Sequence, residues 1–256
     1  MRRLVILGDS HVFALQNGFM ALGGEPPQGF DSVTFLKLFN GADNLGPFFE
    51  AHPDRIVFTG EGVTRNLARR LGQPALSTAD RDTTVFGFSM GLMTTIMVRS
   101  GDWALHAPAS AGALIAEKWR RRYLVSDAIV ETIALDQQKH VLAFFTAAKA
   151  MGLRFMAISA PPLRADEHAI VRGRSANVIA AVDRLARSAL TKAFAEMGVP
   201  VVLPLPETFV DTQDGRFMAA QFRELGPGDT NHANEAFGAV MMPEVIRQAL
   251  ALAGSP

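Results

Sequence analysis

Two short segments near opposite ends of the chain carry residue types that could act together in nucleophilic catalysis. Ser10 follows a short apolar run and precedes a helical pattern, whereas Asp229 and His232 precede the last helical pattern. A serine hydroxyl is a weak nucleophile until a base takes its proton, and a histidine held by a carboxylate is such a base. The segments therefore predict a triad in the chain order Ser10, Asp229, His232, with attack on an acyl carbonyl as its chemistry.

Each segment also has a purely structural interpretation. Ser10 could be a helix N-cap, Asp229 a capping residue, and His232 a surface residue in a first helical turn. The catalytic interpretation is favoured because both segments fall at strand-to-helix junctions of one α/β chain. A metal site of Asp9, His11 and His232 is a further alternative, but it leaves Ser10 without a role. We therefore expect neither a metal ion nor a cofactor.

Five short apolar runs predict the strands of a sheet. The run Leu4–Leu7 is rich in branched side chains and closed by Gly8, which is typical of a strand buried on both faces. The other four runs are Ser32–Leu38, Thr84–Phe88, Leu153–Ser159 and Val199–Leu203.

Helical patterns separate most of these runs. They cover His11–Leu22, Asp127–Met151, Ser175–Met197 and a last segment from about Asn234, which Pro243 is expected to kink or restart. The spacing in the second pattern predicts one buried face that includes Ile129 and Ile133. This alternation predicts an α/β fold with a mainly parallel five-stranded sheet covered on both sides. We interpret residues 1–256 as one domain with an irregular insertion at about 92–126.

In an open parallel sheet, ligands collect at the carboxyl ends of the strands. Polar residues and glycines that follow the predicted strands are therefore candidates for the site, and they are Asp9, Gly41, Asn44, Gly91 and His168. We expect Asp9, Asn44 and His168 to contact a substrate.

Three segments also resemble a known family, the SGNH or GDSL-type hydrolases. Val5–Ser10 (VILGDS) is similar to the opening block of that family, with His11 where many members have leucine. Asp229–Asn234 (DTNHAN) is similar to its closing D-x-x-H block, and Ser159–Pro162 resembles the loop that often follows its fourth strand. The resemblance implies a flavodoxin-like three-layer α/β/α sandwich. It also implies Ser10 as nucleophile, His232 as general base and Asp229 as its orienting partner.

The chain departs from that family at the oxyanion hole. The family takes its donors from the nucleophile N–H, a glycine N–H after the second strand and an asparagine side chain after the third. Gly41 fits the glycine, but Met93 or a neighbour stands where the asparagine is expected. Loss of one donor costs about 10²–10³ in rate. This leaves a slow enzyme, a site with another donor (Asn40, Asn44 or the Gly91 N–H), or an inactive binding protein.

We assign the oxyanion donors to Ser10, Gly41 and Gly91. The combined pattern predicts a serine ester hydrolase that acts on a small-molecule ester through an acyl-enzyme. An acyltransferase with the same triad and a catalytically weak or inactive binding protein are the alternatives. A nucleotide-binding protein ranks lowest, because no glycine-rich phosphate loop follows the first strand.

The composition excludes several classes of function. Of 256 residues, 25 are Lys or Arg, 25 are Asp or Glu, and none is Cys. The balanced charge argues against a nucleic-acid partner, and the absence of cysteine excludes thiol catalysis and iron–sulfur clusters. No apolar run reaches the ~18 residues of a membrane span, and the first run is too short for a signal peptide. The expected location is therefore cytoplasmic, and Trp103 and Trp119 are candidates for a homo-oligomer contact.

Overall fold

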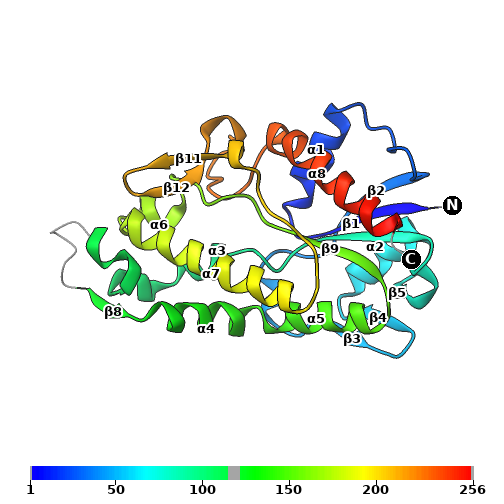
Figure 1. Ribbon diagram of the computed structural model, residues 1–256, viewed down its shortest axis with the longest axis horizontal. Coiled ribbons are helices and arrows are strands. Elements are labelled where there is room, and N and C mark those ends of the chain that lie inside the picture. The colour runs from blue at the N-terminus through cyan, green and yellow to red at the C-terminus, as the bar shows by residue number, and fades with distance from the viewer. Residues whose placement is uncertain (1, 115–121, 255–256) are drawn as a thin grey trace.

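Five parallel strands form the central sheet, in the order β10-β9-β6-β1-β2 (Figure 1). Their bounds are β1 Arg3–Gly8, β2 Ser32–Lys37, β6 Thr84–Ser89, β9 Arg154–Ile158 and β10 Val201–Val202. The structure is a computed structural model that describes residues 2–114 and 122–254. Counted within this sheet alone, the order is the 2-1-3-4-5 of flavodoxin-like folds, so the predicted fold class is confirmed.

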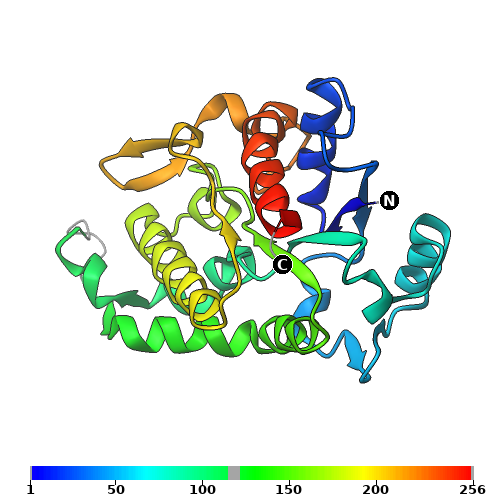
Figure 2. The same ribbon diagram turned by 45° about the vertical axis from the view of Figure 1, so that its right-hand side comes forward.

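Helices cover both faces of the sheet (Figures 1 and 2). One face carries α1 (Val12–Ala21) and α8 (Glu235–Gly254); the other carries α2 (Glu61–Leu71), α5 (Lys139–Ala150) and the end of α7 (Ala176–Glu196). Along β1, Leu4 and Ile6 pack toward α1 and α8, whereas Val5 and Leu7 pack toward α5. None of these four side chains is exposed, which explains why the strand is a continuous apolar run.

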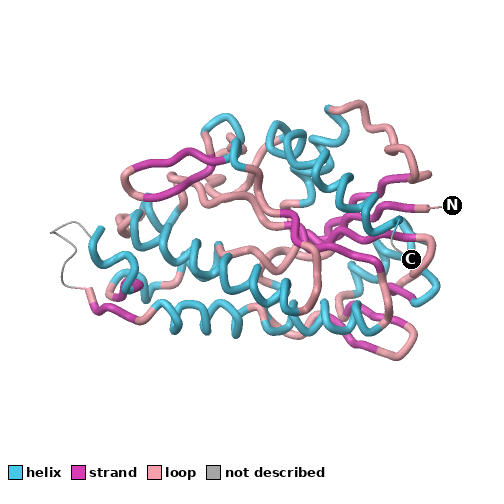
Figure 3. Tube along the Cα trace, viewed as in Figure 1, coloured by secondary structure: helices cyan, strands magenta, loops and turns pink. Residues whose placement is uncertain are grey.

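Shorter elements surround these layers (Figure 3). They are β3 Phe49–Ala51, β4 Arg55–Phe58, β5 Ala75–Ser77, α3 Thr95–Arg99, β7 His106–Pro108, β8 Tyr123–Val125, α4 Asp127–Gln137, α6 His168–Val171, β11 Phe209–Thr212 and β12 Gly215–Met218. The segment 92–126 contains α3, β7 and β8. Trp119, one of the two tryptophans considered for an oligomer contact, lies outside the described residues.

Helices α1 and α8 cross closely at a pair of glycines. A Cβ atom added to Gly238 would lie 1.7 Å from the carbonyl oxygen of Ala14, and one added to Gly18 would lie 2.1 Å from the backbone of α8. Side chains at a helix contact set the distance between the axes, so the two glycines permit this approach. Because Ser10 precedes α1 and His232 precedes α8, the crossing holds the two ends of the chain together.

The helix predicted over Asp127–Met151 is instead two helices, α4 and α5, which are interrupted at Gln138. The backbone of Gln138 has φ −98° and ψ 11°, outside the helical range. The prediction of one continuous buried face was therefore wrong for α4, where Ile129 and Ile133 are 50% and 36% exposed. Packing against α7 selects a different face, whose buried residues are Val130 and Ala134.

Helix α8 is continuous through Pro243, so the proline does not restart it. Among the described residues, α8 is the one helix that is long and apolar enough, by length and composition alone, to cross a membrane. One of its sides packs on α1 and the sheet, where Met241, Met242 and Val245 have no exposed surface. A core helix passes the same test of length and composition, and this packing accounts for the apolar residues of α8.

Candidate active site

Ser10 lies at the point where the strand order of the sheet reverses. From β1 the chain first forms β2 on one side and later β6 on the other, and ligands of open α/β sheets bind at such a switch point. Gly8 ends β1 where it passes β6, and a Cβ atom there would lie 2.2 Å from the carbonyl oxygen of Ser89. The sequence therefore turns at a glycine and presents Ser10, which is half-buried, at the rim of the sheet.

The turn that carries Ser10 is stabilised by the carboxylate of Asp9. Its Oδ1 accepts the backbone N–H of His11 at 2.9 Å, and its carbonyl accepts the N–H of Val12 at 3.2 Å. Asp9 is only 1% exposed, so it has almost no surface with which to touch a substrate. The predicted substrate contact of Asp9 is therefore replaced by a role within the turn.

The side chains of Ser10, His232 and Asp229 form a continuous hydrogen-bonded chain. Ser10 Oγ lies 2.7 Å from His232 Nε2, and His232 Nδ1 lies 2.7 Å from Asp229 Oδ2. When Nδ1 carries the proton and donates it to Asp229, Nε2 accepts the Ser10 hydroxyl proton. The structure thus brings together three residues from opposite ends of the sequence, at the distances that a serine nucleophile and its general base require.

Asp229 is fixed by its own loop as well as by His232. Its Oδ1 accepts the backbone N–H groups of Asn231 at 3.0 Å and of His232 at 2.9 Å, which leaves Oδ2 for the imidazole. Burial raises the pKa of Asp229, but the N–H groups of His232 and Asn231 and the imidazole outweigh it and hold that pKa below its ordinary value. Asp229 is therefore an anion at neutral pH.

Two backbone N–H groups are candidates for the donors of an oxyanion hole. Within the described part of the chain, the N–H groups of Ser10 and Gly41 have no hydrogen-bond acceptor. Gly41 lies beside Asp9, since a Cβ atom on Gly41 would be 3.7 Å from Asp9 Oδ2. The same Cβ atom would be 2.2 Å from the sulfur of Met93, so the thioether occupies the space next to Gly41. A thioether cannot donate a hydrogen bond.

The remaining predicted site residues occupy other environments. Gly91 has φ +90° and packs between Phe194 and Val141, in the core on the α5 side of the sheet. His168 begins α6, a helix that packs against α3 and α7. Neither residue has a contact with Ser10 or His232 among those identified in the described parts of the chain.

Asn44 has no exposed surface, which argues against the predicted contact with a substrate. It lies in a short 3₁₀ helix, Asp43–Leu45, which packs on α5. Both polar atoms of its side-chain amide lack a hydrogen-bond partner among the described residues. A buried amide without partners is costly, so Asn44 is a weak point of the loop that carries Gly41.

Sequence reasoning missed two arginines that contact the Asp229–His232 loop. Arg164 donates to the carbonyl oxygen of His232 at 3.1 Å, and Arg99 donates to the hydroxyl of Thr230 at 3.1 Å. Arg164 is only 3% exposed. Arginine is rarely buried, and no local spacing signals that one will be.

His11 is a second histidine beside the candidate base. Its ring centroid lies 5.1 Å from that of His232, at an angle of 53°. Burial lowers the pKa of His11, which therefore stays neutral at pH 7 and adds no positive charge to the site. Its Nδ1 is buried without a hydrogen-bond partner within the described chain.

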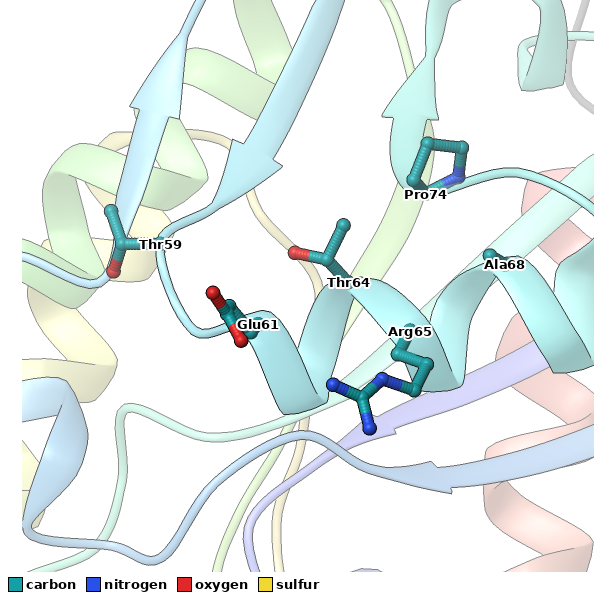
Figure 4. A pocket seen from close by; sticks show the side chains of 6 residues that line it. All are labelled: Thr59, Glu61, Thr64, Arg65, Ala68 and Pro74. Carbon is teal, nitrogen blue, oxygen red and sulfur yellow. The ribbon is translucent and has the colours of Figure 1, made fainter.

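The cavity beside His11 is small, and both polar and apolar residues line it. Its volume is ≈ 10 Å³, about the smallest that can hold one water molecule. Its lining includes His11, Thr95, Arg187 and Asn231. Two larger hollows lie elsewhere. One of ≈ 250 Å³ lies between α3 and α4, and one of ≈ 380 Å³ lies on α2, where Figure 4 shows Glu61 and Arg65 at its edge. The triad side chains line neither of them.

The alternative metal site does not form in the described part of the molecule. No group of three or more His, Asp or Glu side chains there is arranged to hold a metal ion, and this includes Asp9, His11 and His232. The chemistry that the arrangement can perform is instead proton transfer from a serine hydroxyl to an imidazole, next to two unoccupied N–H donors.

Comparisons with known proteins find similar folds at low sequence identity. No protein-family model matches the sequence, and no curated protein matches it significantly. A GDSL-like lipase from Bacteroides thetaiotaomicron is similar over 98% of this chain and 88% of its own, with 12% identity and a TM-score of 0.44. A lipase/acylhydrolase from Enterococcus faecalis is similar over 97% and 95%, with 12% identity and a TM-score of 0.43.

An acetyl xylan esterase from Geobacillus stearothermophilus is similar over 97% of this chain and 94% of its own, with 10% identity and a TM-score of 0.45. At such identities and TM-scores, these likenesses assign neither an activity nor a substrate to this chain. What this site can do has to be argued from its own atoms.

Proposed function

We propose that the protein is a serine ester hydrolase. The observation that carries the proposal is the pair of 2.7 Å contacts, from Ser10 Oγ to His232 Nε2 and from His232 Nδ1 to Asp229 Oδ2. A nucleophile, a base within hydrogen-bond distance and a third group that orients the base are the requirements of acyl transfer. A capping serine and a surface histidine do not require this contact.

In the proposed reaction, His232 Nε2 takes the hydroxyl proton while Ser10 Oγ bonds to the ester carbonyl carbon. The carbonyl π electrons move to oxygen, where the N–H groups of Ser10 and Gly41 stabilise the oxyanion. The C–O bond to the alcohol then breaks, and His232 returns the proton to the leaving oxygen. Water, deprotonated by the same imidazole, attacks the acyl-enzyme and releases a carboxylic acid and free Ser10.

The proposal is tested by removing the nucleophile. A fluorophosphonate probe should label the wild-type protein at Ser10, and Ser10→Ala should abolish both this labelling and the hydrolysis of p-nitrophenyl acetate. Ser32→Ala is a matched control, because Ser32 begins β2 at the opposite end of the sheet. Turnover that survives Ser10→Ala would overturn the proposal.

A binding protein that uses the same site is the second candidate. The observation that favours it is the Met93 thioether beside Gly41, where a third donor would raise the rate. If a broad panel of esters gives neither labelling nor turnover with the folded wild-type protein, this second candidate replaces the hydrolase.

A further inference from the structure

Arg164 is a buried cation that connects two loops of the site. It follows β9, and its Nη1 donates to the carbonyl oxygens of Glu224 at 2.8 Å and of His232 at 3.1 Å. Its Nε and Nη2 donate to the two carboxylate oxygens of Asp166 at 2.9 and 2.8 Å. This two-bond pairing fixes the plane of the guanidinium. Asp166 thus fixes the orientation of the Arg164 side chain, which donates a hydrogen bond to the backbone of His232.

The same guanidinium also faces the triad carboxylate. Arg164 Nη1 lies 3.7 Å from Asp229 Oδ1, the oxygen that does not bind the imidazole. In the described part of the chain, no other Arg or Lys lies within 4.0 Å of this carboxylate. A positive charge here offsets part of the negative charge that Asp229 presents to His232. Arg164 therefore sets the charge around the carboxylate that orients His232.

Other charged groups act on His232 less directly. The neutral His11 ring faces it from the turn before α1. Arg223 lies 3.9 Å from Asp166, on the outer side of the Arg164 pair. The remaining charged groups on the elements packed around this loop are Asp9, Arg99, Glu167, Asp183, Arg187 and Glu224. Arg187 is paired with Asp183 and Arg99 with Glu167, whereas Arg164 is the cation of the described residues that lies within 4.0 Å of Asp229.

We propose that Arg164 is a positioning residue that both holds the His232 loop and sets the pH range over which His232 acts as a base. This inference rests on the proposed function, because it concerns the efficiency of the same triad. The Arg164 side chain has two effects under this inference. The hydrogen bonds to the carbonyl oxygens place the ring, and the charge on Asp229 controls how readily the ring loses its proton.

The experiment compares Arg164→Gln, which is neutral, with Arg164→Lys, which keeps the charge but loses the planar fork. For Arg164→Gln, the acid limb of the kcat/KM profile should move up by about 0.5–1 pH unit, because the imidazolium loses a repulsive neighbour. The variant should also lose kcat. Arg164→Lys should lose kcat while its acid limb stays in place. Arg154→Gln, at the far end of β9, is the control for net charge and should change neither quantity.

Asp166→Asn removes a negative charge, whereas Arg164→Gln removes a positive one, so the expected shift has the opposite direction. This test also remains possible if the Arg164 variants do not fold. Asp166 is 44% exposed, so its loss is tolerated more easily than loss of buried Arg164. Removing its negative charge should move the acid limb downward. A loss of kcat in Arg164→Gln with no movement of the acid limb would overturn the inference and leave a purely structural role.

A readout that is independent of turnover separates this inference from the proposed function. NMR of ring-labelled histidine follows the titration of His232 directly in wild type, Arg164→Gln and Asp166→Asn. If the midpoints move in opposite directions but the wild-type protein hydrolyses no ester, the inference stands and the hydrolase proposal fails. If esters are hydrolysed but the midpoints coincide, the hydrolase proposal stands and the inference fails.

Discussion

On one side of the Ser10 hydroxyl, the groups that handle the proton are paired with one another, whereas on the other side the groups that would meet an oxyanion are unpaired. The proton side consists of His232, Asp229 and the buried Arg164, joined by contacts of 2.7 to 3.7 Å. Each polar atom there that must keep its orientation has a partner. That side is therefore preorganised before any substrate binds.

The oxyanion side is built on a loop whose own hydrogen bonds, such as that from the Asn40 N–H to Asp43 Oδ2 at 2.8 Å, do not involve the candidate donors. The N–H groups of Ser10 and Gly41 have no acceptor within the described chain, Met93 contributes only a thioether, and the amide of Asn44 is buried without partners there. The comparison indicates that proton transfer is well supported, while charge stabilisation depends on two N–H groups. We therefore expect substitutions on the proton side to lower the rate most, and an added donor on the oxyanion side to raise it.

The largest effect is expected for Asp229→Asn. An asparagine amide would donate to His232 Nδ1 and move the proton to Nε2, where it blocks acceptance of the Ser10 hydroxyl. By analogy with other triads, kcat should fall about 10⁴-fold with little change in KM. The measurement is steady-state hydrolysis of p-nitrophenyl acetate, with Asp136→Asn as a control at a surface carboxylate that is 71% exposed.

Retention of more than a tenth of the wild-type kcat in Asp229→Asn would show that the carboxylate does not orient the base. The proton side would then have no advantage over the oxyanion side. The wild-type pH profile adds a check, because the pKa of Asp229 lies below its ordinary value. Protonation of Asp229 should therefore contribute to loss of activity only at strongly acidic pH.

The second effect concerns the crossing of α1 and α8, the helices that follow Ser10 and His232. In Gly238→Ala, the new Cβ atom would lie 1.7 Å from the carbonyl oxygen of Ala14, so α1 and α8 must separate. We expect a loss of about 3 kcal/mol in the free energy of unfolding, measured by urea denaturation. Activity of the folded fraction should also fall, because Ser10 and His232 move with the two helices.

Gly62→Ala is the control for that substitution. Gly62 lies in α2 with no atom within 4 Å of an added Cβ, so alanine should stabilise the helix slightly. An equal stability of wild type and Gly238→Ala would show that the crossing is not tight. The register between Ser10 and His232 would then have to come from the loops alone.

How far the sequence predicts this site depends on how local each signal is. The turn at Ser10 could be predicted, because a continuous apolar run, a glycine and a helical pattern follow one another within a few residues. His232 and Asp229 could be expected at the same edge, because the ends of parallel strands and the starts of the following helices share it. The parallel sheet follows from the alternation of strands and helices, whereas the family resemblance implied its flavodoxin-like order.

Features set by tertiary packing could not be predicted in this way. The break at Gln138 and the buried face of α4 depend on how α4 packs against α7, and Ile129 and Ile133 gave the wrong face. The burial of Arg164 depends on carbonyl groups more than fifty residues away in the chain. Periodicity describes one element at a time and contains no information on such partners.

The third effect addresses the oxyanion side directly. In Met93→Asn, the side-chain amide would add a donor next to Gly41, where the thioether now lies. Since one donor is worth about 10²–10³ in rate and the new amide is not held in place by other groups, we expect kcat to rise by about tenfold. Met93→Leu, which keeps the volume and adds no donor, is the matched control and should keep the wild-type rate.

If Met93→Asn and Met93→Leu have the same kcat while both remain folded, a third donor at this position does not limit the reaction. The comparison between the two sides would then have to be revised, because the two N–H groups would suffice. Thermal melting of both variants checks that they fold, since the side chain of Met93 is buried.

The smallest effect is expected for Asn44→Leu. Both amide atoms of Asn44 are buried without partners among the described residues, so an apolar side chain of similar size removes an unsatisfied group. We expect the free energy of unfolding to rise by about 1 kcal/mol, measured by urea denaturation. Asn40→Leu is the control, because Asn40 is exposed and its amide oxygen already accepts a hydrogen bond from Lys37, so no gain is expected. Activity decides what Asn44 does: an unchanged kcat in the stabilised variant assigns it no part in the reaction, whereas a fall of tenfold or more would show that its amide turns toward the substrate and supplies the third donor that Met93 lacks.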